Sequence, residues 1–308
     1  MLLRGVNKVG CHRMARPVLG TLVEIRIDHP DLTIARTALE EGFREVYRIQ
    51  DLMSVYDERS EVFGLNRKGF YENACPETLE VVKKGIYYSE LTEGAFNIAI
   101  LPVLNLWEGA ARSGVAPTDS EIGKAMQLTN WRDISIKGKN IRLRKDGMAL
   151  TLGGVAKGYA IDRAVDAIKK LGVKRAMVNG GGDIRVVGGN GNGAWRVGVR
   201  SPNKERRLIT VVELADQAIA TSGTDRRPLD DIINSESGTP AKRVKSSTVV
   251  AEHAVDADVL ATAVYVLGAG KGMRLIESLK GVEGLIVNNN GEAITSSGFM
   301  NVTTNMEV

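Results

Sequence analysis

GGVAKGYAIDRAVDAIKKLGVKRAMVNGGGDIRVV, residues 153–187, joins a glycine-rich segment to an amphipathic pattern and then to two short apolar runs. Apolar residues recur at helical spacing from about Lys157 to Leu171, and Gly172 follows them as a C-terminal cap signal. The runs AMVN and DIRVV are rich in residues that favour strands. This stretch therefore predicts a helix that leads into a sheet.

The region that continues to about Glu252 is mostly strand. It contains WRVGVR, LITVVEL, AIATS and STVVAE, with Gly, Pro and Asn between them. Helical patterns lie outside it, at about 32–53, 76–91, 256–267 and 271–279. Because strand runs and helix runs are segregated, the sequence predicts an α+β fold of mixed and antiparallel sheets with packed helices, rather than a doubly wound one.

Smaller elements follow from local signals. Alternating apolar and polar residues over 21–27 predict a half-buried strand. Pro76 is expected to open the second helix, and Asn290-Gly291 to form the turn of a C-terminal hairpin. The remaining expected elements are a helix cap at Thr118 or Asp119 and short strands near residues 141–144 and 148–153.

The composition of the 308 residues excludes several classes of protein. Hydrophobic residues make up 43% and charged residues 25%, which is typical of a globular chain. The charge excess is only 41 − 37 = +4 and aromatic residues are 5%, so no nucleic-acid partner is expected. Two cysteines and three histidines show no disulfide framework or metal spacing. No transmembrane segment and no secretory signal are expected, because long apolar runs are missing.

Two glycine-rich motifs are candidates for ligand binding. Gly153-Gly154-Val155-Ala156-Lys157-Gly158 lies where a strand enters a helix, and helix N-termini bind phosphate through free N–H groups. Its spacing matches neither the dinucleotide nor the P-loop motif. Asn179-Gly180-Gly181-Gly182-Asp183 lies between strands, where a flexible turn is the plainer interpretation.

Two further motifs carry acids and hydroxyls. Asp258 and Thr262 are four residues apart on a predicted helix, so they share one face and form a pair of hard oxygen ligands suited to Mg²⁺. The alternative is an Asp placed in a first helical turn by the helix dipole. Thr221-Ser222-Gly223 is followed by Asp230-Asp231, which could supply a general base or form a solvated turn.

In this order, the motifs resemble those of the FAD:protein FMN transferase family, the ApbE-type flavin transferases. The resemblance runs from about Pro17 to Ile286 through LGTLVEI, MSVYDERSEVFGLN, GAFNIAILPVLNLW, GGVAKGYAIDRAVD, MVNGGGDIRVVG, AIATSG and SSTVVAEHAVDADVLATAVYVLG. It implies an ApbE-like fold, with a flavin transferase domain over residues 17–308, as one body or as two intertwined lobes. Residues 1–16 would then be an N-terminal extension.

The resemblance also implies an activity. Family members bind FAD and Mg²⁺, move the FMN half onto a Thr or Ser hydroxyl of a target protein, and release AMP. Their targets are exported or membrane redox subunits, which implies work outside the cytoplasm. Two alternatives stay open for this chain: a flavin-binding protein that does not transfer, and a pyrophosphatase that converts FAD to FMN and AMP.

Site residues follow from the resemblance position by position. Asp258 and Thr262 match side-chain metal ligands, whereas Ala156 and Ala261 match positions that bind the metal through backbone carbonyls. The positions that match FAD contacts are Leu19, Tyr56, Ala95, Phe96, Asn97, Gly153, Tyr159 and Ile232.

The chain departs from the family pattern at five positions. The family loop carries His before Ile-Ile-Asp-Pro, and here Asp231 replaces the His, Asn234 the Asp and Ser235 the Pro. Asn97 replaces the Asp of the family's GxFDP, and Leu19 the Met of MGT. Asp231 is therefore the candidate catalytic base, with an unperturbed pKa of about 3.9.

Overall fold

An eight-stranded sheet forms the centre of the computed structural model, which describes residues 10–189, 193–202, 207–223 and 232–306. The strand order is β1-β2-β6-β7-β10-β13-β14-β15, and each neighbouring pair is antiparallel. The strands are β1 (Gly10–Val18), β2 (Thr21–His29), β6 (Ala176–Gly180), β7 (Asp183–Val187), β10 (Ala218–Gly223), β13 (Ser246–Ala251), β14 (Glu283–Val287) and β15 (Ala293–Thr295). The expected hairpin is present as β14 and β15, and Gly291 in its loop has a positive φ.

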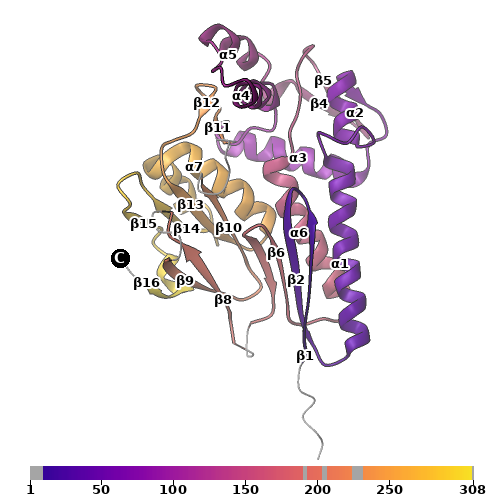
Figure 1. The fold of residues 1–308 in the computed structure, drawn as a ribbon, viewed down its shortest axis with the longest axis vertical. Coiled ribbons are helices and arrows are strands. Elements are labelled where there is room, and N and C mark those ends of the chain that lie inside the picture. The colour runs from indigo at the N-terminus through magenta and orange to yellow at the C-terminus, as the bar shows by residue number, and fades with distance from the viewer. Residues whose placement is uncertain (1–9, 190–192, 203–206, 224–231, 307–308) are drawn as a thin grey trace, which may run out of the picture.

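Three long helices lie side by side against one face of this sheet (Figure 1). They are α1 (Leu32–Met53), α6 (Gly153–Lys170) and α7 (Ala254–Glu277). The other helices are α2 (Glu61–Lys68), α3 (Pro76–Leu91), α4 (Leu101–Ser113) and α5 (Asp119–Met126), with 3₁₀ turns at Trp131–Asp133 and Phe299–Val302. This combination of antiparallel sheets and packed helices confirms the predicted α+β class.

Three smaller sheets complete the fold. One has the order β16 (Thr303–Met306), β9 (Leu208–Leu214) and β8 (Trp195–Arg200). The second has the order β3 (Phe70–Tyr71), β5 (Asn140–Leu143) and β4 (Ile134–Lys137). The third pairs β11 (Ile233–Asn234) with β12 (Thr239–Pro240).

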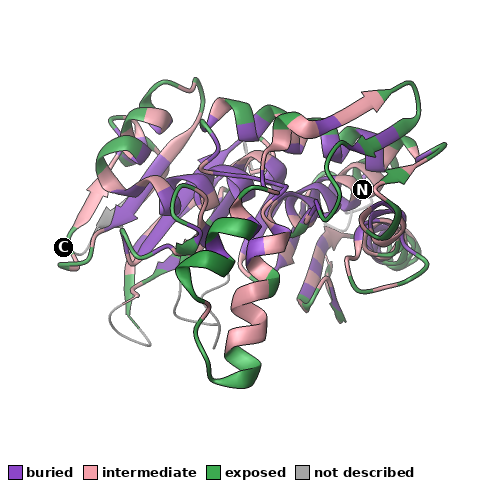
Figure 2. Ribbon diagram, turned by 90° about the horizontal axis from the view of Figure 1, so that it is seen from above, coloured by how far each residue is buried: buried purple, intermediate pink, exposed green. Residues whose placement is uncertain are grey.

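Strands β7, β13 and β14 of the central sheet are buried on both faces because their side chains alternate between two cores. Val249 and Ala251 of β13 belong to the core under α1, α6 and α7, whereas Val250 belongs to a second core that includes Trp195 of β8 and Val212 of β9. Successive side chains along a strand point to opposite faces of the sheet, so one strand can supply residues to both cores. Figure 2 shows this buried centre and the more exposed α4 that projects from it.

The predicted helix boundaries hold where a local cap defines them. The carboxylate of Asp31 accepts hydrogen bonds from the N–H groups of Thr33 and Ile34 at the start of α1. Pro76 occupies the first turn of α3. Thr118 and Glu121 form a capping box at the start of α5, as predicted.

Other boundaries differ from the prediction. Residues 148–152 form no strand, because Leu150 makes its backbone hydrogen bonds with the Asn66 side chain instead of a neighbouring strand. The helix expected from about Lys157 begins four residues earlier, at Gly153, because the Leu152 carbonyl already accepts the N–H groups of Val155 and Ala156. By contrast, the two helices expected at 256–267 and 271–279 are present as the two parts of α7, which the non-helical residue Gly268 separates.

The N-terminal boundary falls within a strand. An extension over residues 1–16 was expected from the resemblance, but β1 begins at Gly10 and pairs with β2 along its whole length. Residues 10–16 therefore belong to the central sheet, and residues 1–9 lie outside the described part of the chain.

Helix α7 is, by length and composition alone, apolar enough to cross a membrane. In its most apolar window of 18 residues, 56% of the residues are buried inside the protein. Its contacts with α6, β10 and β13 account for this apolar character, because a core helix needs apolar side chains around most of its surface.

Helices α6 and α7 meet backbone to backbone at Gly158. A Cβ atom at this position would lie 2.5 Å from the carbonyl oxygen of Ala254 and 2.7 Å from the Cα of Val255. Backbone atoms cannot rotate away as a flexible side chain can. The glycine therefore sets how closely the two helices approach.

We expect Gly158→Ala to lower the free energy of unfolding by roughly 1–2 kcal/mol in urea denaturation. Overpacking costs about 1–3 kcal/mol, which exceeds the helix-propensity gain of about 0.5–1 kcal/mol. Gly109→Ala in α4 is the matched control, since nothing lies within 4 Å of the added Cβ. The control should be neutral or slightly stabilising, and equal effects of the two substitutions would contradict the close approach at Gly158.

Candidate active site

A cleft of about 1840 Å³ opens beside the starts of α6 and α7. Segments distant in sequence line it: the end of α1, the start of α6, the loop after β6 and the end of β10. Its lining includes Leu19, Tyr56, Ala95, Phe96, Asn97, Gly153, Ala156, Lys157, Asp183, Ser222, Ile232, Asp258 and Thr262. The structure thus brings most of the expected site residues into one cavity.

The first turn of α6 forms one wall of the cleft. Its N-cap residue, Leu152, makes no side-chain cap hydrogen bond, and no acidic residue lies in the first turn. The start of a helix carries a partial positive charge, which favours an anionic ligand. Gly154 lies under the ring of Phe96, and a Cβ there would lie 3.0 Å from Phe96 Cε2. Glycine therefore lets the phenyl ring close over the helix start.

Asp258 of α7 lies directly against α6, as expected for a shared ligand site. Its Oδ2 accepts a hydrogen bond of 3.0 Å from the Gly158 N–H, and its Oδ1 lies 3.4 Å from Lys157 Nζ. The residue is only 5% exposed. Buried carboxylates of this kind are stabilised by N–H donors and a nearby cation.

Lys157 also forms an ion pair with Asp183, the last residue of the Asn179–Asp183 motif. Both residues lie in glycine-rich motifs that the sequence offers as candidates for ligand binding, but the sequence assigns neither of them a role, and a turn is the plainer interpretation of the second motif. Gly181 and Gly182 have positive φ, which supports the turn, but Asp183 extends from it into the cleft. The cleft therefore contains one lysine between two acids from β7 and α7.

Thr262 lies one turn after Asp258 on α7. Its hydroxyl donates to the carbonyl oxygen of Asp258 at 3.2 Å and lies 3.2 Å from the hydroxyl of Ser222 on β10. Thr221, Ser222 and Ser246 also line the cleft. A row of hydroxyls on β10 and β13 therefore borders the candidate metal ligands.

The two alanines expected to act through backbone carbonyls lie at different depths. Ala156 lines the cleft. Ala261 is fully buried and outside the lining, and its carbonyl oxygen accepts a hydrogen bond of 2.6 Å from Ser247 Oγ. As a carbonyl inside α7 it also accepts the helical N–H group four residues later, so a metal contact there would compete with two hydrogen bonds already formed.

Leu19 enters the cleft from a strained turn. Leu19 and Gly20 form a two-residue connection between β1 and β2, and both have positive φ. A non-glycine residue in this conformation is uncommon. The Leu19 N–H donates to Gln50 Oε1 of α1 at 2.7 Å, which holds the turn.

Tyr56 lies at the mouth of the cleft, whereas Asn97 is buried in its wall. Tyr56 is 78% exposed, and its hydroxyl donates a hydrogen bond to Glu108 Oε1 at 3.4 Å. Asn97 donates from Nδ2 to the Thr129 carbonyl and accepts at Oδ1 from the Ala99 N–H. It therefore fixes the loop that carries Ala95 and Phe96.

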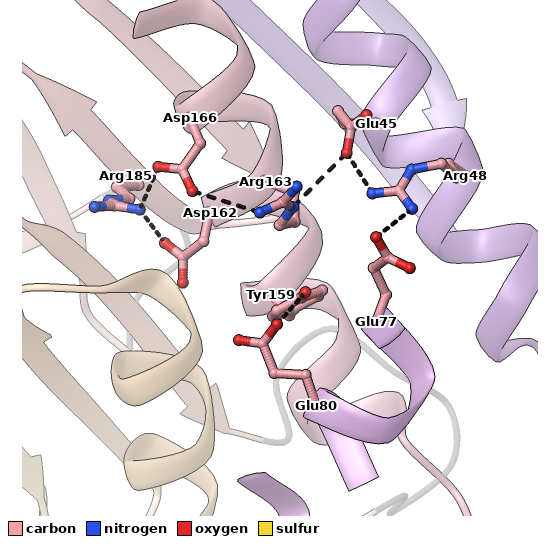
Figure 3. A network of polar contacts seen from close by, with 9 residues as sticks. All are labelled: Glu45, Arg48, Glu77, Glu80, Tyr159, Asp162, Arg163, Asp166 and Arg185. Atoms are coloured by element: carbon pink, nitrogen blue, oxygen red, sulfur yellow. Dashed lines mark hydrogen bonds and ion pairs between the residues drawn. The ribbon is translucent and has the colours of Figure 1, made fainter. Parts of the chain in front are cut away.

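Tyr159 points away from the cleft. Its hydroxyl donates to Glu80 Oε2 of α3 at 2.8 Å (Figure 3), and the residue lies outside the cleft lining. Burial and the Glu80 carboxylate raise the pKa of this phenol well above its usual value. Its side chain links α6 to α3, so a ligand contact would have to use its backbone.

Asp231, the candidate base, lies outside the described residues. The chain is described again from Ile232, which lines the cleft. Trp107 Nε1 donates to the Gly238 carbonyl at 2.8 Å, which anchors the β11–β12 hairpin to α4. Asn234 accepts the Glu236 N–H at its side-chain oxygen and so stabilises the turn of this hairpin.

Comparisons with known proteins agree with this geometry. The sequence profile of the ApbE family matches residues 19–286. A Vibrio cholerae protein named FAD:protein FMN transferase is 32% identical over 294 residues, covering 90% of this chain and 88% of that protein. A protein of the same name from Treponema pallidum is 26% identical, covering 96% of this chain and 90% of that protein.

Solved structures show the same fold. The flavin transferase ApbE from Vibrio cholerae superimposes with a TM-score of 0.85 at 30% identity, covering 95% of this chain and 100% of that one. The ApbE protein from Thermotoga maritima gives a TM-score of 0.88 at 29% identity, covering 96% and 100%. On its sequence, its fold and the cleft described above, this chain belongs to the ApbE family.

Proposed function

We propose that the protein is a Mg²⁺-dependent transferase that moves FMN from FAD to a Thr or Ser hydroxyl of a target protein and releases AMP. The observation that carries the proposal is the contact between Asp258 and the start of α6, beside Lys157, in a cleft large enough for a dinucleotide. Names of the ApbE relatives from Vibrio cholerae and Treponema pallidum support the same reaction class.

Three oxygen donors of the cleft lining fit Mg²⁺: the Asp258 carboxylate, the Thr262 hydroxyl and the Ala156 backbone carbonyl. The Ala261 carbonyl, outside the lining, is the fourth donor that the resemblance implies, and all four are hard ligands. Within the described ranges, no three His, Cys, Asp or Glu side chains converge on a metal position. Mg²⁺ is typically held by one or two carboxylates together with substrate phosphates, which this donor set matches. When bound, the ion would neutralise charge on the diphosphate.

Other residues of the cleft could bind the phosphates and the planar rings of FAD. Lys157 and the N–H groups at the start of α6 are placed to balance phosphate charge in the cleft. Tyr56 offers an exposed ring at the cleft mouth, and Phe96 a ring over Gly154, against which planar groups can stack. Positioning and charge neutralisation are the main requirements of phosphoryl transfer.

The reaction needs a proton acceptor. The acceptor hydroxyl forms a new bond to the phosphorus of the FMN half, the bond from that phosphorus to the bridging oxygen breaks, and AMP leaves. The hydroxyl proton passes to a base, for which Asp231 is the candidate from the sequence. An ionised carboxylate accepts protons weakly unless burial or nearby phosphate raises its pKa.

The transfer itself is tested with purified chain, FAD, Mg²⁺ and a target protein that the Vibrio cholerae relative flavinylates. A covalent FMN adduct seen by mass spectrometry, together with AMP, is the expected result. AMP without adduct would indicate FAD hydrolysis, and saturable FAD binding without AMP would indicate a flavin-binding protein. Either result contradicts transfer, provided that the relative modifies the same target.

Asp258→Asn should lower transfer by at least about 100-fold and raise the Mg²⁺ concentration needed for half-maximal rate. Loss of a residue that only supports a metal ligand typically lowers metal affinity or activity by about 10–100-fold, and loss of a ligand should lower them at least as much. Initial rates over a Mg²⁺ series measure both effects. Asp256→Asn is the control, because Asp256 accepts a hydrogen bond from Tyr88 and lies outside the cleft lining. A normal Mg²⁺ dependence in Asp258→Asn would show that Asp258 is not a ligand.

Asp231→Asn should reduce the transfer rate by about 10²–10⁴-fold with little change in FAD affinity, because a general base contributes in this range. Single-turnover rates and fluorescence titration of FAD separate the two quantities. Asp230→Asn supplies a neighbouring acid as the control. Equal rates for the Asp231→Asn variant and the unmodified chain would exclude Asp231 as the base.

A further inference from the structure

Helix α7 begins without a cap of its own. His253, the residue before the helix, has an extended backbone and makes no side-chain cap hydrogen bond. The first two N–H groups of the helix are nevertheless paired: Ala254 donates to Asp162 Oδ1 at 2.9 Å and Val255 to Asp162 Oδ2 at 3.0 Å. The capping carboxylate therefore comes from the middle of α6, about ninety residues earlier in the chain.

Asp162 is buried and held from its other side by an arginine. Arg185 of β7 donates from Nη1 to Asp162 Oδ1 at 2.8 Å, and Figure 3 shows the two side chains pointing toward each other. Arg185 is also buried, and Asp166 lies 3.9 Å from its guanidinium. Burial raises the pKa of Asp162, against the opposing effect of Arg185 and the two N–H donors.

The two residues of α6 that hold α7, Asp162 and Gly158, lie on the same side of α6. Asp162 follows Gly158 by four residues, so the two positions share one face of the helix. Gly158 contacts the backbone of Ala254 and donates its N–H to Asp258, which itself lies four residues after Ala254. Helix α7 is thus held at its first residue by Asp162 and one turn later by Gly158. A slip of α7 by one residue would move Asp258 by 1.5 Å along the axis and by about 100° around it.

We propose that Asp162 is a positioning residue of the active site: by capping the start of α7 from α6, it places Asp258 and Thr262 for divalent-cation binding. Asp162 itself lies outside the cleft lining, so it acts only through α7. The inference rests on the proposed function, because it concerns the same metal ligands. It assigns a role to Asp162, which lies within the motif GGVAKGYAIDRAVD but is not among the site residues that the resemblance implies.

The test must separate capping from the loss of a buried ion pair. Asp162→Ala alone would leave Arg185 buried without its main partner, which commonly destabilises strongly. The informative pair is Arg185→Met, which keeps the cap, and Asp162→Ala/Arg185→Met, which removes it. A third variant adds His253→Asp to this double variant, because Asp at an N-cap position can satisfy the same N–H groups locally. Thermal unfolding of all three confirms that they fold.

Two measurements apply to each variant: the dissociation constant of Mn²⁺, from the electron paramagnetic resonance of the free ion, and amide hydrogen exchange of the α7 start. We expect Asp162→Ala/Arg185→Met to bind Mn²⁺ about 10–100-fold more weakly than Arg185→Met and to exchange faster at residues 254–258. Addition of His253→Asp should restore most of both properties.

Unchanged Mn²⁺ affinity in Asp162→Ala/Arg185→Met would overturn the positioning role of Asp162. The positioning role would also be overturned if adding His253→Asp to the double variant restored protection from hydrogen exchange but left the Mn²⁺ affinity weak. The absence of Mn²⁺ binding by the unmodified chain would instead overturn the metal site of the proposed function. The two failures are therefore distinguishable.

Discussion

The crossing of α6 and α7 is the contact on which the rest of the site depends. Gly158 lets the two backbones touch, and its N–H group binds the carboxylate of Asp258. A larger residue would separate the helices, because the atoms it would meet belong to the backbone. The distance between the start of α6 and the candidate metal ligand is thus set by a single missing side chain. The central sheet supports this crossing, since both helices pack on the same face of it.

Buried charge distinguishes the cleft from an apolar cavity. Lys157 lies between Asp183 and Asp258, which come from β7 and α7. Both carboxylates are almost fully buried, and buried charges need partners of opposite sign. The hydroxyls of Thr262 and Ser222 add polar oxygens without adding charge. The positive start of α6 lies close by, so the proposed cation and phosphate sites would adjoin each other.

One strained backbone position, Leu19, lies at the same cleft. Leu19 adopts a conformation that glycine or asparagine adopts more readily, and Gln50 of α1 holds its N–H group. Strained residues persist where the surrounding structure determines them, and they are common at ligand sites. The turn places an apolar side chain beside the cleft at a position where the family pattern has methionine. The tight connection between the first two strands of the sheet is thus one of several segments that line the cleft.

Local sequence determined the elements whose signals are contained within a few residues. The 22-residue α1, the proline at the start of α3 and the capping box of α5 all follow from spacing and capping chemistry, and the i, i+4 pair Asp258 and Thr262 follows from helical geometry. The strand β1 and the helices α2 and α4 were not predicted, and Asp231 stays a prediction because it lies outside the described residues. Only the tertiary structure decided that Asp258 meets Gly158 and Lys157, and that Asp162 caps α7. These partners are about a hundred residues apart, and no local pattern specifies which distant backbone group a buried carboxylate will find.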